Sequence, residues 1–172
     1  MEATAKYKNY FEKYTELVPE KSVNDALKTQ DAKLQEFTSR VSEENAAFAY
    51  QESKWSLKEM LQHLIDTERI FTYRALAIAR KDPSDLPGYD ENNYAVNSFA
   101  NNRTWASLTE EILSLRKCTK LLFNSFTAEM LNASGTFNNI SGDVNTIGFI
   151  IAGHAYHHIQ VAEERYFTAI FK

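Results

Sequence analysis

Long stretches with an apolar residue at every third or fourth position are the feature that most limits how this chain can fold. Glycine and proline, which would interrupt such stretches, are scarce: the 172 residues include 5 glycines and 3 prolines. Apolar residues at this spacing line one face of an α-helix, whereas a half-buried strand needs strict alternation. Because such alternation is hard to find in this chain, the sequence predicts an all-α fold.

Serine residues mark the predicted starts of three long helices. The motifs are "SVND" at 22–25, "SLKE" at 56–59 and "SLTE" at 107–110. In a capping box, the serine side chain accepts a hydrogen bond from the backbone N–H of the residue three positions later. The acidic side chain of that residue accepts a hydrogen bond in return from the backbone N–H of the serine. The second helix should end near Arg80, before "DPSDLPG", and a fourth helix should run from about Val144 to the last residues.

Four long amphipathic helices predict a four-helix bundle. The predicted connection between the second and third helices, residues 81–106, is longer than a tight turn requires, and "ENNYAVNSFANN" within it could form a short helix. Residues 1–20 form an N-terminal extension, in which residues 4–17 could form another short helix. A chain of this length suits one domain, which we place at 1–172.

The composition excludes several classes of protein. The net charge of -4 provides no basic surface for a phosphate backbone, so we expect no nucleic-acid partner. We find neither a signal peptide nor a stretch apolar enough to span a membrane. Cys118 is the only cysteine, which fits a reducing compartment, and we expect it to be a buried or inert residue. These observations predict a soluble cytoplasmic protein.

Three of the four histidines lie in "GHAYHHIQ", residues 153–160. His154 and His158 are four residues apart, so on a helix both point the same way, and they continue the apolar stripe from Ile147 and Ile151. Two imidazoles at this spacing can share one metal ion. The alternative is that both are core histidines that hydrogen-bond to other buried groups.

His63, on the second predicted helix, favours the metal-binding interpretation. Two histidines from one helix and one from another give three nitrogen ligands and leave a coordination position open for water or substrate. Asp66 could accept the second N–H of His63 and fix its tautomer. The spacing alone does not exclude His157 as a ligand, but the stripe favours His158 and places His157 at the rim.

Other polar residues could form an ion pair between helices or line a pocket. Glu68 lies on an apolar stripe, and we expect it to pair with Arg165 on the fourth helix. The long connection offers candidates for lining a pocket, although each could equally belong to a plain polar loop. These candidates are Tyr89, Asp90, Asn93 and Tyr94.

Two segments of the chain resemble the DinB-like superfamily of metal-dependent enzymes. They are "WSLKEMLQHLIDTERIF" at 55–71 and "TIGFIIAGHAYHHIQVAEERY" at 146–166, and "LPGYDENNYA" at 86–95 resembles a further family segment. The resemblance covers most of the chain from about residue 22. It implies a four-helix bundle with up-down-down-up topology and a long connection between helices two and three.

The resemblance also implies a function. The histidine ligands of the family map onto His63, His154 and His158, with a divalent metal such as zinc or nickel. Relatives include transferases and isomerases that use bacillithiol, mycothiol or glutathione, others assigned as hydrolases, and many homodimers.

A metal held by three histidines can activate either a thiol or a water molecule. We therefore expect a metal-dependent thiol transferase or hydrolase that acts on a small molecule, with a low-molecular-weight thiol as a possible co-substrate. The alternative is a non-catalytic bundle that binds a small ligand or a protein partner and holds a structural or adventitious metal.

Overall fold

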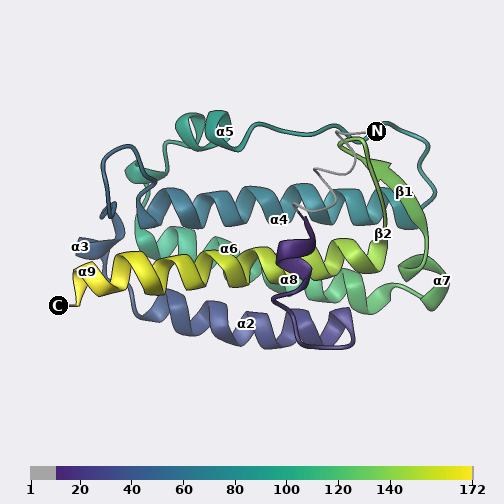
Figure 1. Ribbon diagram of the computed structural model, residues 1–172, viewed down its shortest axis with the longest axis horizontal. Helices are drawn as coiled ribbons and strands as arrows, with labels where there is room; N and C mark the ends of the chain where they lie inside the picture. Colours follow the sequence, from purple (N-terminus) through teal and green to yellow (C-terminus); the bar gives the residue numbers. More distant parts are fainter. Residues whose placement is uncertain (1–10, 172) are drawn as a thin grey trace.

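Four long helices lie side by side in the computed structural model, which describes residues 11–171 (Figure 1). They are α2 (Val23–Ser39), α4 (Leu57–Ala79), α6 (Trp105–Ser125) and α8 (Val144–Val161). The predicted all-α four-helix bundle is confirmed.

Two of the three predicted serine caps are present. Ser22 accepts a hydrogen bond from the backbone N–H of Asp25, and Ser56 forms the full capping box with Glu59. The predicted cap at Ser107 is wrong, because α6 begins earlier, at Trp105. Thr104 is the N-cap, and its hydroxyl accepts a hydrogen bond from the N–H of Ser107 at 3.2 Å. The earlier start places the Trp105 side chain in the core, where it is buried.

The helices follow the up-down-down-up topology. In Figure 1, α2 and α8 run from right to left, whereas α4 and α6 run from left to right. Each of α2 and α4 packs against both α6 and α8, so α2 and α4 lie diagonally across the bundle. α4 and α8, which carry the four histidines, are therefore antiparallel neighbours.

The long connection follows from this topology. α4 and α6 run in the same direction, so the chain must return along the whole of α4, about 35 Å, before α6 can begin. On the way it forms the predicted short helix, α5 (Glu91–Ser98), and a 3₁₀ turn, η1 (Ala100–Asn102). Both lie along the outside of α4 (Figure 1).

A small β-hairpin at one end of the bundle was not predicted. β1 (Ser134–Phe137) pairs antiparallel with β2 (Ile140–Asp143), after the short helix α7 (Ala128–Leu131). The two-residue turn, Asn138 and Asn139, has positive φ at both positions, which is the geometry of a type I′ hairpin. Asparagine tolerates this conformation better than most residues.

The first and last described segments, residues 11–15 and 162–170, pack against the bundle. α8 continues into a π-helical segment, η2 (Ala162–Phe167), and then into α9 (Thr168–Ile170). This agrees with the prediction of one helix from about Val144 to the last residues. Residues 11–15 are helical, which agrees with part of the short helix predicted at 4–17; residues 4–10 of that prediction lie outside the described residues. A further short helix, α3 (Glu43–Ala46), follows α2.

The core consists of two apolar clusters with a polar layer between them. One cluster surrounds Leu27, Phe123 and Ile147, and the other surrounds Leu34, Leu61 and Ile112. Between the two clusters, each long helix contributes one or two buried polar side chains. These are Gln30, Thr67, Glu68, Arg116, Thr119 and His154. A buried polar layer that all four helices supply is a natural place for a site.

Two further expectations can be compared with the structure. Cys118 was expected to be either buried or inert; it is exposed, so the first of these alternatives is wrong. It lies on the outer face of α6, next to the buried Thr119 rather than in the core. Among residues 11–171, no helix is long and apolar enough to cross a membrane.

Candidate metal centre

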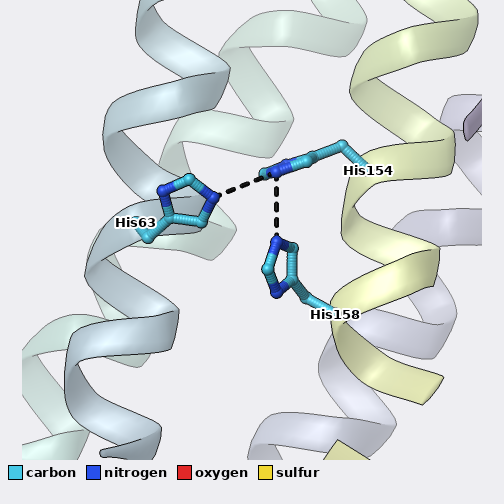
Figure 2. Close-up of side chains that lie close together, drawn as sticks. All are labelled: His63, His154 and His158. Carbon is cyan, nitrogen blue, oxygen red and sulfur yellow. Dashed lines mark hydrogen bonds between the residues drawn. The ribbon is translucent and has the colours of Figure 1, made fainter. Parts of the chain in front are cut away.

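His63, His154 and His158 converge from two helices. His63 projects from α4, and His154 and His158 project from α8, one turn apart (Figure 2). The Nε2 atom of His154 lies 3.0 Å from Nε2 of His63 and 3.2 Å from Nε2 of His158. One ring nitrogen from each of the three residues lies within 4.8 Å of the others. The predicted meeting of these histidines is therefore observed.

The spacing of these nitrogens suits a shared metal ion. A tetrahedral ion with metal–nitrogen bonds of about 2.0–2.1 Å holds its ligand nitrogens about 3.3 Å apart. The two measured separations, 3.0 and 3.2 Å, are close to this value. The Nε2 atoms of the three imidazoles face one another. When these nitrogens carry no proton their lone pairs converge, and a bound cation would relieve the repulsion between them.

Burial keeps the three histidines neutral. His63 and His154 are buried and His158 is partly buried. Burial lowers the pKa of His63 from about 6.5 to about 4. Burial also lowers the pKa of His154 and His158 well below the ordinary value, with a smaller contribution from neighbouring histidines. Neutral imidazole is the form that binds metals, so the site is ready to accept an ion at neutral pH.

Thr67, rather than Asp66, supports His63. The Thr67 hydroxyl lies 3.5 Å from Nδ1 of His63 and 2.6 Å from the hydroxyl of Tyr89. Asp66 instead accepts a hydrogen bond from Gln62 at 2.9 Å, so the predicted contact between Asp66 and His63 is wrong. Asp66 lies three residues after His63 and four after Gln62, so both are helix neighbours, and its carboxylate binds the second of them.

Aromatic rings enclose the imidazoles. The Trp55 ring lies 4.7 Å from that of His63, and the Tyr14 ring lies edge-on to His154 at 5.2 Å, measured between ring centroids. Tyr14 also covers His157, at 5.5 Å. His157 is not one of the three clustered histidines, and it is partly buried beneath Tyr14.

Gly153 allows Tyr14 to reach this position. A Cβ atom at residue 153 would lie 2.0 Å from the backbone oxygen of Tyr14 and 2.5 Å from its carbonyl carbon. The segment containing residues 11–15 therefore crosses α8 in direct backbone contact, beside His154 (Figure 1). The absence of a side chain at Gly153 therefore admits this close neighbour next to His154.

We expect Gly153→Ala to displace this crossing segment and to lower the free energy of unfolding by about 1–3 kcal/mol, as overpacking typically does. Urea unfolding gives the free energy, and limited proteolysis reports exposure of the segment. Gly142→Ala is the control, because a Cβ there meets Phe137 at an ordinary 3.4 Å. Alanine normally favours helix over glycine by about 1 kcal/mol, so a stabilised Gly153→Ala protein would contradict the observed crossing.

A pocket of about 630 Å³ opens onto His63 and His154. Its walls come from the crossing segment, from α4 and α8, and from the long connection with the hairpin turn. Of the four residues predicted to line a pocket, Tyr89 and Asp90 do so, whereas Asn93 and Tyr94 line a separate hollow with Gln62. The sequence reasoning missed the contributions of Thr67, Phe71 and Arg74, although all three follow His63 at helical spacing.

A buried ion pair lies behind His154. Glu68 accepts three hydrogen bonds from Arg116 at 2.8–3.2 Å, and both residues are almost completely buried. The predicted partner, Arg165, instead donates to the hydroxyl of Tyr50, so that prediction is wrong. Both ion-pair residues and His154 line a cavity of about 10 Å³. The pair thus lines the same cavity as one histidine of the candidate metal centre.

Two comparisons bear on this arrangement. A family model described as the DinB superfamily matches residues 26–162. A solved structure, YfiT from Bacillus subtilis, superimposes with a TM-score of 0.72 at 14% sequence identity, over 83% of this chain and 85% of that one. YfiT is described as a probable metal-dependent hydrolase with an unusual four-helix bundle topology. No curated protein sequence matches this chain significantly.

Proposed function

This chain belongs to the DinB superfamily, and we propose on that basis that it is a metal-dependent enzyme that acts on a small molecule. The observation that carries the proposal is the convergence of three neutral histidines, two of which, His63 and His154, line an open pocket. A structural metal site is normally closed by four protein ligands, whereas a catalytic site keeps one position for water or substrate. Three protein ligands beside a pocket fit the second description.

The three histidines would hold a divalent ion, with zinc or nickel our first expectations. Imidazole nitrogen suits both metals, and nothing in the spacing separates them. A bound ion would lower the pKa of a thiol or a water molecule and so supply a nucleophile near neutral pH. We therefore propose transfer of a low-molecular-weight thiol to an electrophile, or hydrolysis, as the reaction.

The remaining residues of the pocket would orient the site. Thr67 lies between Nδ1 of His63 and the Tyr89 hydroxyl, so it can accept from the imidazole N–H while Nε2 faces the metal. This arrangement fixes the tautomer that a ligand histidine requires. Tyr14 and Trp55 limit the access of bulk water to His154 and His63.

Metal content provides the first test. Protein purified without a histidine tag should bind close to one zinc or nickel ion per chain. His154→Ala should lower the affinity more than roughly 100-fold, because loss of a mere supporting group around a metal already costs about 10–100-fold. Mass spectrometry of the metal and competition with a chromophoric chelator measure these quantities.

His157→Ala is the matched control, because His157 neighbours the site on the same helix but is not in the cluster. It should keep the metal. A folded native protein that binds no metal under any condition would contradict the proposal, as would equal metal affinity in the two alanine variants.

Turnover separates an enzyme from a protein that only binds a ligand. The metal-loaded protein would be incubated with cysteine, glutathione or bacillithiol and monochlorobimane, and separately with simple esters. We expect turnover above that of the free metal with at least one pair, and its loss in His154→Ala. Stoichiometric metal without turnover on any thiol or ester would favour the non-catalytic bundle.

A further inference from the structure

Arg74 is a buried cation in the same pocket as the clustered histidines, and the metal centre does not use it. It lies on the face of α4 that also carries His63, Thr67 and Phe71, all of which line the pocket. Only 3% of its surface is exposed. An isolated charge is costly to bury, so its environment requires a physical explanation.

The protein positions the Arg74 guanidinium without neutralising it. Nη2 donates to the backbone oxygen of Pro87 at 2.6 Å, and the group lies over the rings of Phe71 and Phe137 at 4.9 and 5.3 Å. Among residues 11–171 no carboxylate forms an ion pair with it, and its hydrogen bond to Pro87 uses one of the five N–H donors of the guanidinium. Burial lowers the pKa of Arg74, but arginine stays charged at neutral pH.

Two acidic residues that line the pocket, Asp90 and Glu91, do not form an ion pair with Arg74. The Asp90 carboxylate accepts hydrogen bonds from the backbone N–H groups of Asn92 and Asn93 and thereby caps α5. Glu91 also lines the pocket but makes no ion pair with Arg74. Negative charge at this rim disfavours a dianion such as phosphate, so a singly charged carboxylate is the better complement for one arginine. A guanidinium can bind a carboxylate through two parallel hydrogen bonds.

We propose that Arg74 binds the carboxylate of an elongated substrate or thiol co-substrate whose reacting atom lies at the three histidines. This inference rests on the proposed function and adds the chemical class of its ligand. Arg74 follows His63 by 11 residues, so their Cα atoms are about 16 Å apart along the axis of α4. The Arg74 side chain turns back toward the N-terminus of α4, over Phe71, and so covers part of this distance. A ligand that spans the remainder carries its carboxylate several bonds away from the sulfur or scissile bond.

A series of mercaptocarboxylates tests the proposal on cobalt-loaded protein, where thiolate binding produces a charge-transfer absorption band. The probes are 8-mercaptooctanoate and 3-mercaptopropionate, each with its methyl ester. Native protein should bind the long acid about tenfold or more tightly than the ester, as expected for a charge-assisted hydrogen bond. The short acid spans less of the distance to Arg74 and should show a smaller advantage over its own ester than the long acid does.

Arg74→Gln should abolish the preference for the acid, whereas Arg74→Lys should keep part of it because the charge remains. Arg69→Gln is the matched control, since Arg69 lies on the same helix but pairs with Glu111 outside the pocket. Circular dichroism checks folding, and Arg74→Lys keeps the test decisive if Arg74→Gln unfolds. Equal binding of acid and ester by native protein, or an unchanged preference in a folded Arg74→Gln, would overturn the proposal.

A second measurement distinguishes failure of this inference from failure of the proposed function. Metal-free native protein and metal-free Arg74→Gln are titrated with octanoate by calorimetry. Binding that is lost in Arg74→Gln supports the carboxylate site even if the native protein fails to hold cobalt. Octanoate binding that is absent from native protein, or equal in both proteins, overturns the carboxylate site even if the metal centre is sound.

Discussion

Replacing Arg116 by methionine is expected to lower the free energy of unfolding by about 3–5 kcal/mol, the typical cost of breaking a buried ion pair. Methionine removes the charge but retains much of the length, so the main consequence is that Glu68 stays buried without its three hydrogen bonds. Urea unfolding monitored by circular dichroism measures the effect.

Two companion variants make this result interpretable. Arg116→Met combined with Glu68→Leu should regain most of the lost stability, because no charge then remains buried. Lys81→Met removes an exposed ion pair with Glu129 and should cost less than about 1 kcal/mol. An Arg116→Met protein as stable as Lys81→Met would show that Glu68 and Arg116 are not paired in the core.

Acid should destabilise the metal-free protein between about pH 6.5 and pH 4. His63 has a pKa of about 4 in the folded protein and about 6.5 when exposed, so in this window the unfolded chain takes up a proton that the folded protein excludes. Stability is therefore greatest above pH 6.5 and falls as the pH falls. The loss from His63 alone is about 3 kcal/mol, and His154 and His158 shift in the same direction.

Urea unfolding in the presence of a chelator, at several pH values, measures this dependence. His63→Gln should flatten the curve, because its side chain takes up no proton in either state. Zinc should stabilise the native protein most at neutral pH and progressively less in acid, since protons compete with the metal for the same nitrogens. A native curve that is flat from pH 6.5 to 5 would contradict the buried, neutral histidines.

The features that could be predicted from the sequence are those that depend on local spacing. The caps at Ser22 and Ser56 and the one-turn relation of His154 to His158 each depend on residues within four positions of one another. Helix geometry alone relates such positions, whatever the rest of the chain does. His63 could be added because its helix carries a strong apolar stripe.

The predictions that were wrong concern places where two local arrangements are both favourable, or where contacts between residues far apart in the sequence select one of them. Thr104 and Ser107 are both good cap residues, and burial of Trp105 decides between them. Glu68 could meet an arginine on either neighbour of α4, and its own direction on the helix selects Arg116 on α6. The four-residue strands of the hairpin are too short to show alternation, and the Asn-Asn turn is their only clear signal.

The diagonal placement of α2 and α4 has a consequence for how the protein is made. Chains emerge from the ribosome from the N-terminus, yet α2 packs against α6 and α8, which are made later than α4. His63 likewise emerges long before His154 and His158, its partners on α8. A nascent chain that ends before α8 offers a metal only one of the three ligands. Loading of the proposed metal at all three histidines therefore requires that α8 has been made.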